Sequence, residues 1–314
     1  MGAQTMWGDK PYHSLDYEMK QRFGEKVYKI SLDGGMTCPN RDGSIGTGGC
    51  IFCSGNGSGD FASGKCGSVT EQITNGIREI SARKKTGRKF IAYFQSFTNT
   101  YAPVPVLEPM FREAIAHPDV VMLSIATRPD CLPEDVLTLL ERLNKRKPVM
   151  VELGLQSIHP ATAAYIRRGY PLSVYDTAVE SLKSIGIEVV THVIAGLPFE
   201  SRRDFLDTVS YVGNIGSDGI KLQLLHVLRE TDLAKEYRRG AFDVLTMEEY
   251  VDWIIDAISL LPPDMVIHRL TGDGPKDLLL APLWSSRKRD VLNTLHKTLK
   301  DRQIWQGKEY CHGK

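Results

Sequence analysis

Apolar positions along the chain fall into six short runs, separated by longer segments with a helical period. The runs lie at residues 27–33, 89–97, 120–127, 149–157, 187–198 and 219–228. Near-continuous apolar strands that alternate with helices are typical of a parallel sheet covered by helices. Six units are too few for a closed eight-stranded barrel. The pattern therefore predicts a curved, partly open barrel, with its chemistry on loops at the carboxyl ends of the strands.

Several of the predicted helices begin at a capping box, in which a hydroxyl side chain and an acid three residues later bind free amides of the first turn. The pairs are Ser68 with Glu71, Ser173 with Asp176, Ser201 with Asp204, and Thr246 with Glu249. The last pair precedes an amphipathic helix whose apolar stripe holds Met247, Tyr250, Val251, Ile254, Ile258 and Leu261.

The alternation of strands and helices divides the chain into three parts. We expect residues 1–22 to form a lead-in, residues 23–262 the barrel core, and residues 263–314 a C-terminal extension. The alternation ends at two consecutive prolines. Beyond them, the extension holds one strand-like stretch, MVIHRL, and a helix predicted over residues 286–301.

Composition and charge set broad limits. The 314 residues are 42% hydrophobic and 25% charged, with a formal net charge of +1. A chain of this size should bury a sizeable core, and any surface for a polyanion must be local. The N-terminus has no signal-peptide core and no apolar run is long enough to span a bilayer, so we expect a cytoplasmic protein without membrane contact.

Basic stretches offer local candidates for phosphate contacts. They lie at residues 83–89, 142–147 and 286–289 and in the C-terminal tail, with Trp284 and Trp305 near two of them. A solvated helix face explains each basic stretch as simply, and burial explains the tryptophans.

Three of the six cysteines lie on one glycine-rich segment after the first predicted strand. Cys38, Cys50 and Cys53 have the spacing C-x11-C-x2-C, and eleven glycines lie from Gly34 to Gly67. Clustered thiols in a reduced cytosolic chain indicate metal ligands rather than disulfides. A structural zinc site needs four ligands and would have to recruit Cys66. Three thiolates suit an iron-sulfur cube with one iron left open for catalysis.

The other cysteines are expected to be spectators. Nothing at metal-ligand spacing surrounds Cys131 or Cys311, and Cys66 has a role only in the zinc alternative.

The cysteine segment and several later motifs resemble the radical S-adenosylmethionine (SAM) enzymes. The motifs are TCPNRDGSIGTGGCIFCS, TRPD, VELGLQS, RRGY and HRLTGDGPKDLLLAP, which are spread over nearly the whole chain. Together they are similar to the YhcC/YtqA-type (MnmL-like) branch and to the radical domain of the Elongator catalytic subunit. The first cysteine spacing is longer than the C-x3-C-x2-C of most members.

The resemblance implies a partial (βα)6 TIM-like barrel of the radical SAM type with a short C-terminal extension. It also implies a [4Fe-4S] cluster on the three cysteines and SAM at the open iron. The residues implied to bind SAM are Phe52, Gln95, Ser96, Asn99, Glu152, Gln156, Arg168 and Ile194. Gln95, Ser96 and Asn99 are candidates because FQSFTNT replaces the glycine-glycine-glutamate run usual in the family.

The implied roles differ along the barrel. Phe52 and Ile194 would contact the adenine, and Glu152 and Gln156 the ribose. The fork of Arg168 suits a carboxylate.

Five further residues are candidates for catalysis or substrate contact. His192 and Lys221 lie on the fifth and sixth predicted strands and should point into the barrel. His226, Arg269 and Asp273 belong to motif-like stretches near the sixth strand and in the extension. Each has a plainer interpretation as a satisfied core group or a salt bridge.

The resemblance further implies a reaction and partners. The reduced cluster would cleave SAM to a 5'-deoxyadenosyl radical, which takes a hydrogen atom from the substrate. The implied substrate is tRNA, with a carboxymethylaminomethyl group at carbon 5 of a wobble uridine converted to aminomethyl. A flavodoxin or ferredoxin would supply the electron, and a methyltransferase would be a partner.

Two alternatives stay open at this point. One is a radical SAM enzyme that acts on a small molecule or peptide. The other is a zinc-stabilised nucleic-acid-binding protein without catalysis.

Overall fold

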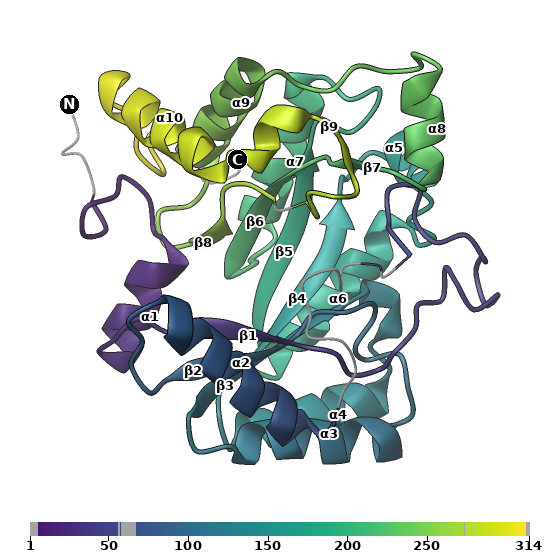
Figure 1. Ribbon diagram of the computed structural model, residues 1–314, viewed down its shortest axis with the longest axis vertical. Coiled ribbons are helices and arrows are strands. Elements are labelled where there is room, and N and C mark those ends of the chain that lie inside the picture. The colour runs from purple at the N-terminus through teal and green to yellow at the C-terminus, as the bar shows by residue number, and fades with distance from the viewer. Residues whose placement is uncertain (1–5, 56, 58–66, 273, 312–314) are drawn as a thin grey trace.

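The computed structural model describes residues 6–55, 57, 67–272 and 274–311. They form a curved parallel sheet in the order β1-β2-β3-β4-β5-β6-β8 (Figure 1). Its strands are β1 (Tyr28–Leu32), β2 (Phe90–Phe94), β3 (Val120–Thr127), β4 (Val149–Gln156), β5 (Glu188–Ala195), β6 (Gly219–Leu224) and β8 (Val266–Arg269). All neighbouring strands of this sheet are parallel, so their carboxyl ends share one edge.

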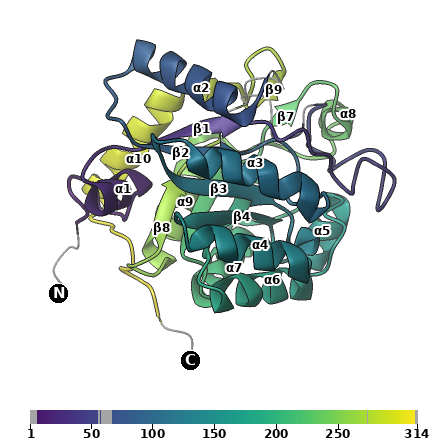
Figure 2. The same cartoon turned by 90° about the horizontal axis from the view of Figure 1, so that it is seen from below.

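Helices cover the outer, convex face of the sheet (Figure 2). They are α2 (Val69–Arg83), α3 (Val104–Ala116), α4 (Glu134–Asn144), α6 (Leu172–Ser184), α7 (Arg202–Asn214) and α9 (Met247–Leu260), with α10 (Lys288–Asp301) packed on α9. Shorter elements are α5 (Pro160–Tyr165), α8 (Asp232–Arg238), η1 (Pro129–Cys131) and η2 (Leu283–Ser286). Outward side chains such as Phe94, Ile125 and Leu153 are fully buried in the main core beneath the helices.

The predicted partial barrel is confirmed, but its sheet has seven strands rather than six. The extra strand is β8, formed by the strand-like stretch assigned to the extension, and it pairs with β6 through Lys221 and Arg269. The predicted strand at 219–228 is two strands, because β7 (Val227–Leu228) leaves the sheet and pairs antiparallel with β9 (Leu279–Ala281). Local apolar patterning did not reveal which of these stretches would join the sheet.

Three of the four predicted capping boxes are confirmed, at Ser68, Ser201 and Thr246. The prediction for Ser173 is wrong. Helix α6 begins two residues earlier than a cap at Ser173 predicts, directly after Pro171, so Ser173 already lies in the first turn. The extended backbone of this proline supplies the helix boundary there instead of a hydroxyl cap.

The barrel is closed at the amino ends of its strands by apolar side chains. Met19 of α1 (Leu15–Phe23) packs on inward residues of four strands. These are Ile91, Met122, Met150 and Val190, each at most 2% exposed. Helix α1 also contacts β8. The lead-in therefore plugs one end of the barrel, and the plug separates the cavity at the carboxyl ends from a second hollow at the amino ends.

Among the helices of the described residues, none is both long and apolar enough to cross a lipid bilayer.

Candidate functional site

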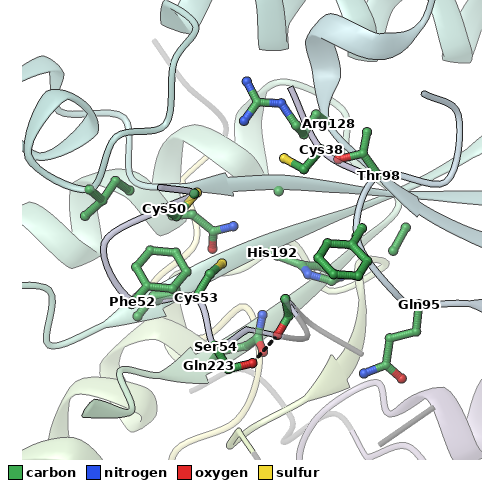
Figure 3. A pocket seen from close by; sticks show the side chains of 18 of the residues that line it. Cys38, Cys50, Phe52, Cys53, Ser54, Gln95, Thr98, Arg128, His192 and Gln223 are labelled. Atoms are coloured by element: carbon green, nitrogen blue, oxygen red, sulfur yellow. Dashed lines mark hydrogen bonds between the residues drawn. The ribbon is translucent and has the colours of Figure 1, made fainter. Parts of the chain in front are cut away.

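A cavity of about 290 Å³ lies at the carboxyl ends of the strands, and all three clustered cysteines line it. Figure 3 shows Cys38 beside Arg128, with Cys50 and Cys53 near Phe52. The segment that carries these thiols directly follows β1, as the sequence predicts. The three candidate ligands are therefore brought to one place by the fold.

Local hydrogen bonds shape the cysteine segment. Asn40 donates its amide to the Arg167 carbonyl oxygen at 2.6 Å and to the Cys50 sulfur at 3.5 Å. Arg41 donates to the Ser54 carbonyl oxygen at 2.5 Å. Gly49 has a φ of +73°, and a Cβ there would lie 2.9 Å from Nε of Arg41. Glycine is needed at this position because a side chain would strain the backbone and displace the arginine.

The thiols are electrostatically unequal. The hydrogen bond with Cys53 lowers the pKa of Cys50 to about 6, helped by Asn40 and Arg128 against the effect of burial. The hydrogen bond with Cys50 and burial raise the pKa of Cys53 above its ordinary value. Thiolate is the metal-binding form of cysteine, so the surroundings already favour it at Cys50.

The donor set fits a cluster better than a single ion. Within the described residues, no three His, Cys, Asp or Glu side chains lie close enough together to hold one metal ion. An iron-sulfur cube binds each thiolate to a different iron, so its ligands lie farther apart than those of one zinc. Cys66, the fourth ligand of the zinc alternative, lies outside the described residues.

Four of the residues expected to bind SAM line the cavity in suitable positions. Phe52 and Ile194 belong to an apolar cluster on one wall. Gln95 and Gln156 add polar atoms. Within the described chain, the Oε1 atom of Gln156 is buried without a hydrogen-bond partner, and the residue has a φ of +70°. An unsatisfied polar atom in a strained position at a cavity is suited to a ligand.

Ser96 and Asn99 are placed differently from expectation, because neither lines the cavity. Asn99 is fully buried and donates its amide to the carbonyl oxygens of Phe94, at 3.1 Å, and Ala126, at 2.9 Å. It therefore ties together the ends of β2 and β3. Ser96 is 2% exposed and lies in a bend after the end of β2.

Arg168 lines the cavity, but its guanidinium is engaged by the protein itself. It donates to the carbonyl oxygens of Tyr170 at 3.1 Å, Leu155 at 3.3 Å and Ser157 at 2.5 Å. These bonds fix the chain after β4, so the structure gives Arg168 a supporting role rather than the expected free fork for a carboxylate.

A second arginine, Arg128, was not among the predicted site residues. It lines the cavity and forms a two-pronged pair with Asp130, at 2.9 and 2.7 Å. Burial opposes its charge, but Asp130 and the neighbouring Cys38 and Cys50 raise its pKa overall. Its signal in the sequence is the TRPD motif at the end of β3.

Polar side chains from four strands converge deep in the barrel around Glu152, and we call them the Glu152 cluster. The carboxylate of Glu152 accepts from Lys29 at 2.5 Å, Ser124 at 2.8 Å and His192 at 2.7 Å. Lys221 also donates to it. The cavity is lined by Glu152, Lys221 and His192. The prediction that His192 and Lys221 point into the barrel is therefore confirmed.

Opposite charges in the Glu152 cluster stabilise one another against the cost of burial. Burial alone would raise the pKa of Glu152, but Lys221, Lys29 and His192 bring it well below the ordinary value. Burial and the nearby Lys221 lower the pKa of His192 to about 4. Glu152 is thus ionised and His192 neutral near pH 7. With its oxygens engaged by four side chains, Glu152 is placed differently from the expected ribose ligand.

Two of the remaining candidates also line the cavity. These are His226 and Arg269. Asp273 lies outside the described residues. Three further residues were not predicted from the sequence. Tyr93 lines the cavity, and Lys29 and Ser124 belong to the Glu152 cluster. Their signal is a period of two, because each polar residue interrupts an apolar strand at an inward position.

The basic stretches at 83–89 and 142–147 lie away from the cavity. They precede β2 and β4, at the amino ends of the strands. Trp284 donates to the Leu245 carbonyl oxygen at 3.0 Å and packs on Tyr250, so it belongs to the core. Neither basic stretch is therefore positioned to contact a substrate that enters the cavity.

Comparison with known proteins gives matches along almost the entire chain. The sequence matches the Radical SAM superfamily over residues 42–212 and the Radical_SAM C-terminal domain over residues 217–301. The protein YtqA of Bacillus subtilis is 45% identical over 300 residues, which cover 96% of this chain and 93% of YtqA.

Elongator proteins are more distant. Elongator complex protein 3 of Schizosaccharomyces pombe is 29% identical over 175 residues, which cover 54% of this chain and 31% of that protein. The solved structure of archaeal Elp3 from Methanocaldococcus infernus, lacking its N-terminus, has a TM-score of 0.66 at 18% identity. The match covers 89% of this chain but 64% of that chain, and it shows a common fold.

Proposed function

The chain belongs to the radical SAM superfamily and is a radical SAM enzyme, and from this premise we propose that its cavity holds a [4Fe-4S] cluster and SAM and acts on tRNA. The observation that supports this most directly is the meeting of Cys38, Cys50 and Cys53 in one cavity at the carboxyl ends of a parallel sheet. Family membership also weighs against the zinc alternative.

The three cysteines would hold the cluster. When bound, it supplies the electron that cleaves SAM and thereby generates the radical that takes a hydrogen atom from the substrate. Asn40 donates a hydrogen bond to Cys50, and Arg128 places positive charge beside two of the thiolates. Both interactions favour the deprotonated, metal-binding form.

The walls of the cavity would hold SAM and exclude water. Phe52 and Ile194 offer an apolar surface to the adenine, and Gln156 offers an unsatisfied amide oxygen to a donor of the ribose or the amino acid part. Ile51, Ile166 and Leu225 extend the same apolar cluster. A dry wall protects a reactive radical from side reactions.

Similarity to Elongator complex protein 3 supports tRNA as the substrate class. An exposed aromatic side chain near the cavity mouth adds to this support. Phe199 follows β5, is 73% exposed and has a φ of +67°. Its ring lies 5.2 Å from that of Tyr165, which packs on the cluster containing Ile194. A strained, exposed aromatic at a rim is suited to stacking on an unpaired base.

The finer assignment is the conversion of a carboxymethylaminomethyl group at carbon 5 of a wobble uridine to an aminomethyl group. Cleavage of SAM needs a one-electron donor, so the proposal includes a flavodoxin or ferredoxin. It also includes a methyltransferase that acts on the product and a cytoplasmic location, where tRNA is modified.

Deleting the gene and profiling tRNA nucleosides by mass spectrometry tests the substrate. We expect the carboxymethylaminomethyl nucleoside to accumulate and the aminomethyl nucleoside to disappear, with both restored by the intact gene. An unchanged profile would contradict the tRNA assignment. The radical chemistry is tested separately with protein reconstituted without oxygen, given dithionite and SAM. Colourless protein that forms no 5'-deoxyadenosine would contradict it.

Two variants with opposite expectations test which end of the barrel contacts RNA. Phe199→Ala should weaken binding of an anticodon stem-loop about five- to a hundredfold, the usual range for one lost base stack. Arg83→Glu with Lys85→Glu reverses two exposed charges at the amino ends of the strands and should leave binding unchanged. The opposite ranking would place the RNA surface at the other end of the barrel.

A further inference from the structure

We propose that Lys221 of the Glu152 cluster binds a carboxylate on the part of the substrate that enters the barrel. The inference rests on the proposed function and specifies the group that the site recognises. It is carried by the charge of the cavity, the placement of Lys221 and the closed end of the barrel.

The cavity has a large excess of basic side chains. Among the described residues that line it, five are basic and one, Glu152, is a carboxylate. The basic residues are Arg41, Arg128, Arg168, Lys221 and Arg269. Protein groups already engage three of them near the mouth: Arg41 and Arg168 bind carbonyl oxygens and Arg128 binds Asp130. These contacts fix the three guanidinium groups in place, whereas Lys221 lies deeper, in the Glu152 cluster, and also lines the cavity.

Lys221 is held so that it can meet a ligand. Its side chain is 7% exposed and lines the cavity. It donates to Glu152 and, at 3.2 Å, to the hydroxyl of Tyr93, so these described contacts use two of its three N–H donors. Lys29 binds the same carboxylate but does not line the cavity. One carboxylate thus faces two ammonium groups, and only one of these can reach a ligand.

The closed amino end determines what kind of anion can arrive. Met19, Ile91, Met122, Met150 and Val190 block the barrel beneath the Glu152 cluster. A phosphodiester continues along the chain in both directions, so it cannot enter a closed cavity end-on. A terminal group on a base can enter, and a carboxylate is the terminal anion that pairs with an ammonium group through charge-assisted hydrogen bonds.

Binding of such an anion would be linked to protonation of Lys221. Burial lowers the pKa of this lysine to about 7, despite the opposing charge of Glu152. A second carboxylate beside the ammonium group favours the charged form. Complex formation above neutral pH should therefore take up protons from the buffer.

The experiment compares ligands that differ only at the carboxylate. The reconstituted, unreduced enzyme with SAM present binds without turnover. Its affinity is measured for an anticodon stem-loop whose wobble uridine carries carboxymethylaminomethyl, and for the same stem-loop with that carboxylate as its methyl ester. We expect the acid to bind roughly ten- to a hundredfold more tightly, as for a lost hydrogen bond to a charged group. Calorimetry at pH 8 in two buffers should show proton uptake with the acid but not with the ester.

Matched lysine variants separate contact from charge balance. Lys221→Met should abolish the preference for the acid. Lys29→Met also removes one ammonium group that binds Glu152, but this group does not line the cavity. The variant should therefore retain most of the preference for the acid. If Lys221→Met does not fold, Glu152→Gln combined with Lys221→Met removes both charges together, and it too should bind acid and ester equally.

Several outcomes would overturn the inference. Equal binding of acid and ester by the unaltered enzyme would do so while leaving tRNA as the substrate. If Lys221→Met and Lys29→Met lose the preference for the acid to the same extent, Lys221 does not contact the carboxylate and its role is structural. Weaker binding of SAM in Lys221→Met, with the preference intact, would assign the lysine to the carboxylate of SAM. If no stem-loop binds at all, the proposed function fails and the inference fails with it.

Discussion

The two faces of strand β4 show how one stretch of chain serves both stability and chemistry. Its outward residues, Val151 and Leu153 among them, are fully buried in the main core under the helices. Its inward residues include Glu152 and Gln156, which line the cavity. The outer face is held by apolar packing, whereas the inner face is held by charges that compensate one another. Neighbouring residues should therefore respond to substitution through different physics.

The largest effect should come from the cysteines, where function can be lost without loss of the fold. Cys50→Ala removes one proposed cluster ligand, so we expect iron content and 5'-deoxyadenosine formation to fall to background. The melting temperature of the iron-free protein should hardly change, because the side chain is half-buried in a loop. Cys311→Ser, at an exposed position, is the control and should keep full iron content. Retained activity in Cys50→Ala would contradict the assignment.

On the inner face, Glu152→Gln should strongly destabilise the fold. The amide leaves the buried Lys221 and the partly buried Lys29 without their counter-charge, which costs about 3–5 kcal/mol. Urea unfolding monitored by circular dichroism measures the loss. Glu152→Gln combined with Lys221→Met should recover part of it, because one unpaired charge is removed. No recovery in the double variant would show that the Glu152 cluster is not held by charge compensation.

On the outer face, Leu153→Ala should cost about 2–5 kcal/mol through a cavity in the core. The side chain is fully buried and makes no polar contact. Unlike Glu152→Gln, this loss should be independent of salt and of pH, which urea unfolding at two ionic strengths would check. A strong salt dependence at Leu153 would remove the contrast between the two faces.

The smallest effect should be a pH dependence of stability from His192. Its pKa is lowered to about 4 from 6.5, through burial and the positive Lys221 and Arg269, against the attraction of Glu152. Between these values the unfolded chain binds a proton that the folded chain does not, so stability falls as the pH falls. We expect a loss of about 2 kcal/mol between pH 6.5 and about 5 from this residue.

The control is His192→Asn, which retains a donor for Glu152 but does not titrate. Urea unfolding across this window should give a shallower slope for the variant, with the remainder due to other histidines such as His268, whose pKa burial also lowers. Identical slopes would mean that His192 binds its proton equally in the folded and the unfolded chain, which would contradict the lowered pKa.

The sequence by itself determined six of the seven strands of the main sheet, the starts of three helices, the three cysteines and the family. Each of these features depends on residues that are close together in the sequence. A strand is a run of apolar residues, a capping box is two side chains three residues apart, and the cysteine segment lies in one loop. Inward positions of β5 and β6 could also be predicted, because side chains alternate with a period of two.

Only the tertiary structure decided how distant segments meet. Lys29 and Lys221 are far apart in the chain, yet both bind Glu152. That contact depends on the curvature and register of the sheet, which bring β1 and β6 across the barrel from each other. The same is true of β8 as the seventh strand and of Met19 as part of the plug. Local patterns record which residues are apolar, whereas long-range packing decides which of them face one another.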